Sequence, residues 1–324
     1  MRVWAVAFLL CGLGLAAWLI ASVGLPAIAS ALEAIGLTGL LAVIGVHLIA
    51  SVVMAAAWWT LRRSTRFGVF VWGRLVRDGG SEVLPLSQVG GFMLAVRVLV
   101  AHGVAGAAAT ATTMVDAILE FLAEIGYLAI GLALVVHLLP RGRVVSWSVG
   151  VPVAVAAATI VGLILMRRTP SDGLRALAAR LVRRGLGPLL QGIAAVRTEM
   201  VEIAGRKRIL AISFLLHLAA WIVSGVEAWM ALRFMGVRLG LDTVLAIESL
   251  VYATRSLGFV VPNAIGIQEG AYVVVGASLG LAPEFALGLS LLKRGRDLAL
   301  GIPALASWHL FEARRAAEAR APAA

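Results

Sequence analysis

Six apolar stretches dominate this sequence, and each is long enough to cross a lipid bilayer as a helix. A helix needs about 20 apolar residues to span a hydrocarbon core of about 30 Å. The six stretches are Val3–Val23, Leu37–Leu61, Thr113–Leu139, Val144–Met166, Ile209–Leu232 and Glu284–Leu310. Of the 324 residues, 61% are apolar and only 14% are charged, whereas soluble domains carry about 25% charged residues. The sequence therefore excludes a water-soluble enzyme and predicts an all-α polytopic membrane protein, with residues 1–324 forming a single membrane domain.

The first stretch also has features of a signal peptide. Arg2 precedes it, and Ala27-Ile28-Ala29 resembles a cleavage site. Signal peptides have apolar cores of about 7–15 residues, and this stretch is longer. We therefore expect an uncleaved first span.

Basic residues between the stretches set the expected orientation in the membrane. Residues 24–36 contain Glu33 but no lysine or arginine, whereas residues 167–208 contain ten basic and three acidic residues. Five arginines follow the second stretch, namely Arg62, Arg63, Arg66, Arg74 and Arg77. Loops rich in arginine and lysine stay in the cytoplasm. We therefore expect these two basic segments and both termini to be cytoplasmic.

Residues 167–208 also contain two apolar faces with helical spacing. These faces are formed by Leu174, Leu177 and Leu181, and by Ile193, Val196, Met200 and Ile203. The pattern predicts a pair of amphipathic helices lying on the inner leaflet. Topology control and adhesion to the membrane explain such a segment, and gathering of anionic lipid is the alternative.

The formal net charge of +11 does not indicate a nucleic-acid partner, because the basic residues cluster between apolar spans. Cys11 is the only cysteine, which excludes an intramolecular disulfide framework and a thiolate metal cluster. The five histidines lack metal-ligand spacing, and no phosphate-binding loop or nucleophile motif is present. We expect no cofactor and no metal, and the oligomeric state cannot be read from the sequence.

Two further regions are apolar but interrupted by glycine, proline and polar residues: residues 79–112 and residues 241–283. Non-helical backbone at membrane depth is tolerated only inside protein or beside a water-filled cavity. The orientation above requires each region to enter and leave on the same side. The sequence therefore predicts about six full spans and two re-entrant hairpins made of broken helices.

The two broken regions resemble copies of each other. At an offset of 177 residues, Pro85 falls on Pro262, Gly103 on Gly280 and Glu120 on Asp297. The flanking spans also correspond, which gives repeat halves of residues 37–139 and 209–310. The halves have opposite expected topology, and this is the inverted-repeat plan of secondary transporters, whose sites lie between paired broken helices.

Three carboxylates, Asp116, Glu120 and Glu124, recur every four residues in the third span and share one helix face. Charges inside a membrane are expensive, and such a face must line a cavity or meet cations. The candidate cations are Arg97, Arg255, Arg294 and Arg296. A buried ion-pair network that only holds helices together is the alternative.

The segment from Val261 to Gly270 carries the sharpest motif, because its proline and glycines free backbone groups ahead of a new half-helix. A free helix N-terminus binds anions such as phosphate. Glu269 would lie in that positive field, although it could instead simply cap its own helix. The corresponding segment of the first half keeps proline, glutamine and glycine but has no matching acid.

These patterns nominate residues for a substrate-binding or transport route. In the first half they are Pro85, Gln88, Gly90, Gly91, Arg97, Asp116 and Glu120. In the second half they are Tyr252, Arg255, Pro262, Asn263, Gly266, Gln268, Glu269, Arg294, Arg296 and Asp297. Arginine suits such a route because its guanidinium binds phosphate through two parallel hydrogen bonds.

The motifs resemble those of the flippase-like family, also called the lysylphosphatidylglycerol synthase transmembrane-region family. The resemblance covers about residues 5–310. It rests on Leu84-Pro85, Gly90-Gly91, Arg97, Gly103, Asp116, Pro262, Gly266, Glu269 and Arg294. The segments Tyr252–Ser256, Val261–Tyr272 and Lys293–Asp297 look most like its hopanoid-biosynthesis-associated subgroup.

The resemblance implies a lipid flippase or transporter of a bacterial inner membrane, handling a hopanoid or an anionic phospholipid. Larger members carry a cytosolic aminoacyl-transferase domain, and because this chain ends at Ala324 that reaction is not expected. Two alternatives stay open: a membrane-embedded lipid-modifying transferase, and a non-catalytic scaffold whose partners are lipid-synthesis enzymes. The sequence does not name the lipid, the direction of movement or its energy source.

Overall fold

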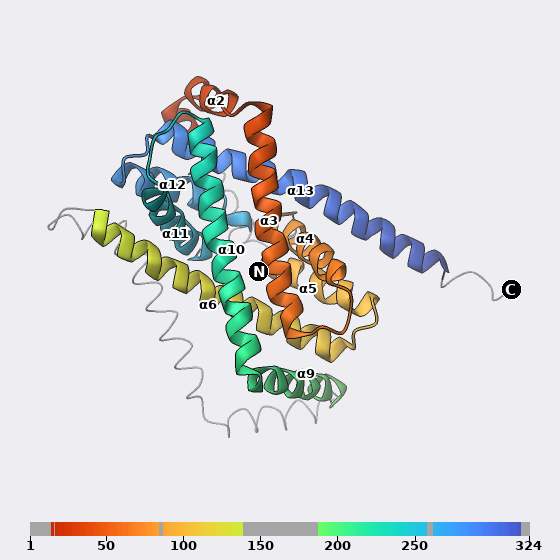
Figure 1. Cartoon of the computed structure of the whole chain (residues 1–324). Coiled ribbons are helices and arrows are strands. Elements are labelled where there is room, and N and C mark those ends of the chain that lie inside the picture. Colours follow the sequence, from red (N-terminus) through yellow and green to blue (C-terminus); the bar gives the residue numbers. More distant parts are fainter. Residues whose placement is uncertain (1–13, 16, 84–86, 139–186, 258–261, 319–324) are drawn as a thin grey trace.

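The computed structural model describes residues 14–15, 17–83, 87–138, 187–257 and 262–318. These residues form helices and no strand, which confirms the predicted all-α class (Figure 1). The α-helices are α2 (Leu25–Glu33), α3 (Gly36–Leu61), α4 (Phe67–Val83), α5 (Ser87–Ala101), α6 (Gly106–Leu138), α9 (Gly187–Gly205), α10 (Lys207–Phe234), α11 (Leu241–Leu257), α12 (Ile267–Ser278) and α13 (Pro283–Glu318). A 3-10 turn, η2 (Pro262–Ala264), separates α11 from α12.

Three of the described helices, α3, α6 and α10, are long and apolar enough to cross a membrane. They correspond to the second, third and fifth predicted spans, although α6 already begins at Gly106. The sixth predicted span falls within α13, a helix of 36 residues that carries several charges. The fourth span and most of the first lie outside the described residues.

The structure corrects the expectation that the arginines after the second span all lie in a loop. Helix α4 begins at Phe67, and both Arg74 and Arg77 are buried within it. The first hairpin is therefore formed by α4 and α5 and begins well before Gly79, the predicted boundary. The positive charges misled the loop assignment because they are paired inside the protein rather than exposed to water.

The second broken region is a broken helix, as the sequence predicts. Asn263 and Ala264 have positive φ angles of 53° and 47°, and Gly266 has a φ of 81°. Residues other than glycine rarely adopt this left-handed conformation. The chain therefore cannot continue as one helix from α11 into α12.

The order of elements in residues 36–138 recurs in residues 207–318. Each segment has a long helix, two short helices and a second long helix, with lengths of 26, 17, 15 and 33 residues in one and 28, 17, 12 and 36 in the other. Gly103 and Gly280, 177 positions apart, end the second short helix of each segment with φ angles of 86° and 87°. Each turn is closed in the same way, by Val104 N–Leu99 O at 3.1 Å and Leu281 N–Gly276 O at 2.8 Å.

The two segments pack together in a reciprocal way. Helices α3 and α10 lie side by side and antiparallel, so that Gly39 near the start of α3 contacts Phe234 at the end of α10 (Figure 1). Helix α6 packs on α11, and α13 packs on α4. Each second long helix thus holds the first short helix of the other segment, which brings both hairpins to the centre of the molecule.

Helix α9 lies across the end of α10 and packs against α6 (Figure 1). Of the apolar face predicted for it, Ile203 is buried, Val196 and Met200 pack against the same apolar cluster, and Ile193 is exposed. The other predicted amphipathic helix, in residues 167–186, lies outside the described residues.

Candidate functional site: a charged cavity between the two hairpins

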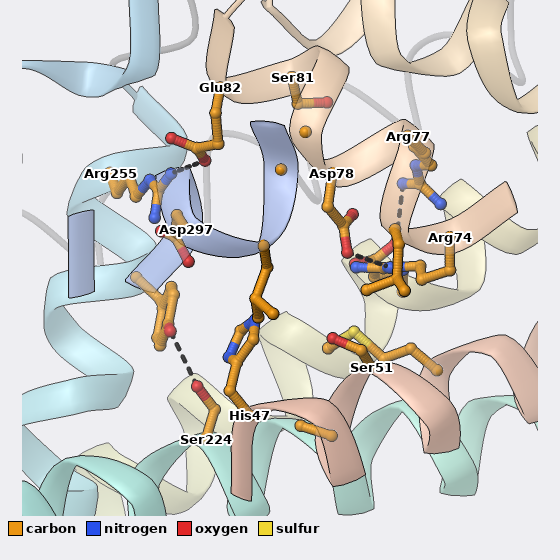
Figure 2. A pocket seen from close by; sticks show the side chains of 18 of the residues that line it. His47, Ser51, Arg74, Arg77, Asp78, Ser81, Glu82, Ser224, Arg255 and Asp297 are labelled. Atoms are coloured by element: carbon orange, nitrogen blue, oxygen red, sulfur yellow. Dashed lines mark hydrogen bonds and ion pairs between the residues drawn. The ribbon is translucent and has the colours of Figure 1, made fainter. Parts of the chain in front are cut away.

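A cavity of about 410 Å³ lies where α4 of the first segment meets η2 and α13 of the second (Figure 2). Helices α3, α6, α10 and α11 complete its wall. Its polar and charged lining consists of His47, Ser51, Arg74, Arg77, Asp78, Ser81, Glu82, Glu120, Glu124, Trp221, Ser224, Tyr252, Arg255, Ser256, Asn263, Arg296 and Asp297. A polar cavity in so apolar a chain matches the expectation that broken backbone surrounds a polar space.

One side of the cavity is an ion-pair cluster between α4 and α6. Arg74 donates two hydrogen bonds to Glu120, at 2.7 and 3.0 Å, and a third to Asp78 at 2.8 Å. Arg77 donates to Asp116 at 2.9 Å and to Glu120 at 2.8 Å. The i, i+3 and i, i+4 spacing of the three α4 residues and the i, i+4 spacing of the two α6 carboxylates place these groups on facing helix surfaces.

The same cluster reaches α10 through His217. Its Nε2 lies 3.0 Å from Asp116 Oδ1, and both side chains are fully buried. One turn later, Trp221 Nε1 donates to the backbone oxygen of Glu120 at 3.3 Å. Helices α4, α6 and α10 are therefore joined by one continuous polar network.

A bridge across the cavity joins the two hairpins. Arg255 of α11 donates to Glu82 of α4 at 2.9 Å and to Asn263 Oδ1 of η2 at 2.8 Å (Figure 2). Beside it, Ser256 hydrogen-bonds to Glu124 of α6. The broken backbone after α11 makes this bridge possible, because it turns Asn263 back toward the helix that it follows.

Glu269 holds the start of α12 rather than the cavity. Its carboxylate accepts two hydrogen bonds from Arg294, at 2.6 and 3.1 Å, and one from the backbone N–H of Gly266 at 2.8 Å. Ser290 donates to it at 3.1 Å and itself accepts a hydrogen bond from Gln268. The motif thus caps its own helix, the alternative that the sequence had left open.

Two further buried groups connect α13 to its neighbours. Lys293 pairs with Glu248 of α11, whose other oxygen accepts from Tyr272 at 2.5 Å. Arg296 pairs with Glu227 of α10 and with the adjacent Asp297, and His47 lies 3.1 Å from Glu227. The first group lies behind the cavity wall, and the second forms part of it.

Comparison with known families identifies the chain. The family model of the lysylphosphatidylglycerol synthase TM region matches residues 3–304. The chain belongs to this family. Membership supports a membrane location and a lipid-related function, while the narrower hopanoid-associated subgroup stays a prediction. The same comparison with curated proteins and with solved structures gives no match.

The structure of this family member brings only some of the predicted route residues to the cavity. Those that line it are Glu120, Tyr252, Arg255, Asn263, Arg296 and Asp297. Those that do not are Gly90, Gly91, Arg97, Asp116, Gly266, Gln268, Glu269 and Arg294. Pro85 lies outside the described residues, and the side chains of Gln88 and Pro262 are not described.

Arg97 was named as a candidate partner of the α6 carboxylates, and this expectation is wrong. Its guanidinium is exposed and pairs with Glu312 at 2.6 Å. Gly91 has a packing role instead, because a Cβ there would lie 2.4 Å from the Arg77 carbonyl oxygen. This contact lets α5 lie close against α4, the helix that carries the actual partners.

The residues that sequence reasoning missed come mainly from α4. Arg74 and Arg77 were assigned to a loop, and Asp78, Ser81 and Glu82 were not considered. The available signal was their spacing: residues 74, 77, 78 and 81 recur at intervals of three and four, the mark of one helix face. A loop gives charges no such period.

Charge in the cavity is not balanced. The lining contains four arginines and five carboxylates, and every one of these arginines already has a carboxylate partner. Two of those partners, Asp116 and Glu227, are additional buried carboxylates behind the lining. The site therefore offers surplus negative charge and guanidinium groups that a ligand obtains only by exchange.

Proposed function

We propose that this protein moves a phospholipid across the bacterial inner membrane and that the cavity between its two hairpins receives the headgroup. The observation that carries the proposal is the cavity itself: a polar space, built from both segments, inside a chain of apolar helices. A headgroup needs such a space to pass the hydrocarbon core, because an unsolvated charge there is costly.

The antiparallel pairing of α3 with α10 supports an inverted repeat of residues 37–139 and 209–310. In transporters built on this plan, one half rocks against the other around a central site. The Arg255–Glu82 bridge joins the two hairpins across the cavity, so it is the contact that such a movement would break and remake. Opening the bridge would expose Glu82, Asn263 and the remaining lining to a headgroup.

The charge surplus favours a headgroup that contains an amine. An ammonium group would pair with lining carboxylates such as Glu124 and Asp297, and a phosphate would take a guanidinium in exchange. A neutral hopanoid uses neither kind of group, and a purely anionic headgroup meets surplus negative charge. We therefore infer a zwitterionic or cationic phospholipid rather than a hopanoid.

Leaflet exposure of a labelled lipid tests this function. Purified protein is reconstituted in liposomes that contain a phosphatidylethanolamine analogue with a fluorescent acyl chain, and dithionite is added outside. Protein-free vesicles lose only the outer-leaflet signal. Wild type is expected to expose the inner-leaflet label as well, whereas Glu120→Gln, which weakens the pairing of Arg74 and Arg77, is expected not to.

Arg206→Gln is the matched control, because it breaks an exposed ion pair with Glu202 on α9, outside the cavity. It should behave like wild type. If wild type and protein-free vesicles are indistinguishable, lipid movement is refuted, and the transferase or scaffold interpretation takes its place.

A further inference from the structure

A column of buried polar groups runs between α6 and α10, away from the cavity. Residues 101 positions apart face each other there: Asp116 bonds His217, and the Glu120 oxygen bonds Trp221. The two helices therefore run in the same direction at this level. Thr112 and Ser213 are also 101 positions apart, and each lies one turn before the Asp116–His217 pair.

Three polar atoms in this column are buried and have no hydrogen-bond partner among the described residues. They are Thr112 Oγ1, Ser213 Oγ and His217 Nδ1, and all three side chains are 0% exposed. Buried polar groups are nearly always hydrogen-bonded. A buried water takes about three such partners, so the three atoms match the demand of one bridging water.

The column has two ends with different surroundings. Ala111 and Leu210, the neighbours of its lower members, pack in the same apolar cluster as Ile203 of α9. At the other end, Asp116 pairs with Arg77, which lines the cavity. The column therefore connects the α9 side of the protein with the cavity.

Histidine is the residue in this column that can both accept and release a proton near neutral pH. The charged groups around it come from three helices. Helix α6 supplies Asp116 and, one turn later, Glu120; helix α4 supplies Arg77 behind Asp116; helix α10 itself contributes Trp221. Helices α3 and α13 direct His47 and Arg296 to Glu227, ten residues further along α10.

We propose that Thr112, Ser213, His217 and Asp116 form a proton path from the α9 side to the cavity and that proton arrival releases Arg77 for the headgroup. A proton from water held by the two hydroxyls binds His217 Nδ1, and the proton on Nε2 passes to Asp116 Oδ1. The products are a neutral carboxyl group and a neutral imidazole of the other tautomer, which a half-turn of the ring restores.

The consequence for the cavity follows from charge. A protonated Asp116 no longer attracts Arg77, which then pairs with Glu120 alone and can bind a phosphate oxygen. When the headgroup leaves, Arg77 returns to Asp116 and the proton departs. This mechanism rests on the proposed lipid movement for its purpose, but the proton path itself can be measured without any lipid readout.

The test is proton entry into liposomes of bacterial polar lipids that contain the full chain and an internal pH dye. A valinomycin-mediated potassium diffusion potential, negative inside, drives the protons. Wild type should acidify the interior faster than protein-free vesicles. His217→Gln should return the rate to that of protein-free vesicles, because glutamine keeps an N–H for Asp116 but does not carry a proton.

The hydroxyl at position 112 provides a matched comparison. Thr112→Val should slow acidification about tenfold, and Thr112→Ser should restore it because the hydroxyl returns. Thr113→Val is the control: Thr113 is equally buried, but its hydroxyl already donates to the Ala109 oxygen at 2.8 Å. It should match wild type. Size-exclusion profiles identify any variant that has failed to fold, and the serine variant then decides.

Two results overturn the path: a wild-type rate equal to that of protein-free vesicles, or an unchanged rate in folded His217→Gln. Dithionite exposure of labelled lipid, measured on the same vesicles, separates this inference from the proposed function. Lipid exposure without proton entry refutes the path and leaves the function standing. Proton entry without lipid exposure does the reverse.

Discussion

The two segments carry their buried ion pairs with opposite polarity. In the first, the cations Arg74 and Arg77 lie on the short helix α4 and the carboxylates Asp116 and Glu120 on the long helix α6. In the second, the carboxylate Glu248 lies on short helix α11 and the cation Lys293 on long helix α13. Asp116 and Lys293 are 177 residues apart, so equivalent positions of similar frames hold opposite charges.

The two clusters also differ in their surroundings. Glu120, Arg74 and Arg77 border the cavity, and each has more than one charged partner. Glu248 and Lys293 lie behind the wall, where each has the other as its single charged partner among the described residues. A network with spare partners can rearrange, whereas an isolated buried pair can only be kept or lost. We therefore assign the first cluster to function and the second to stability.

The largest effect is expected at the isolated pair. Lys293→Met leaves the Glu248 carboxylate buried without a cation, and its free energy of unfolding should fall by about 3–5 kcal/mol. Denaturant titration in mixed micelles, followed by tryptophan fluorescence, measures this. Adding Glu248→Leu removes both charges and should recover most of the loss. A double variant less stable than the single one would contradict the assignment.

The matching change in the first cluster should affect stability less and lipid movement more. In Arg74→Met, Glu120 keeps Arg77 as a partner, so the free energy of unfolding should fall by only about 1–3 kcal/mol. Lipid exposure in liposomes should nevertheless drop to the protein-free level, because the cavity loses a guanidinium. If Arg74→Met proves as destabilising as Lys293→Met, the two clusters do not differ as we infer.

The turn glycines test the likeness of the two segments rather than their difference. Gly103→Ala and Gly280→Ala each force alanine into a φ near +86° or +87°. Each should lower the free energy of unfolding by about 1–2 kcal/mol. The same denaturant titration compares them, and two losses that agree within about 0.5 kcal/mol are expected. A large inequality would show that the two turns lie in different environments.

The smallest effect is expected outside both clusters. Arg97→Gln removes an exposed ion pair with Glu312, whose side chains are 63% and 37% exposed. Exposed pairs contribute little, so neither stability nor lipid exposure should change measurably. Loss of lipid exposure in this variant would restore Arg97 to the route that the sequence motif suggested.

The sequence predicted the spans closely where composition alone decides them. Helices α3 and α10 match their predicted ranges within two residues at each end. The break after α11 was also predictable, because proline and glycine mark interrupted helices whatever their neighbours are. Family membership followed from short motifs spread over most of the chain.

The ion-pair partners were a different matter. The α6 carboxylates required cations, and the sequence offered more arginines than the structure uses. Arg97 and Arg294 stood in conspicuous motifs, yet they pair with Glu312 and Glu269, while the partners of Asp116 and Glu120 come from α4. Periodicity tells which residues share a face, but it does not tell which helix that face meets.

The sequence by itself determined that this chain is a helical membrane protein with broken helices, because apolar length and helix-breaking residues act locally. Only the tertiary structure decided which charges surround the cavity and which hold the frame. Those assignments depend on packing between helices more than a hundred residues apart, such as α4 on α13 and α6 on α11. An ion pair forms wherever packing brings two charges together, and no local pattern records that distance.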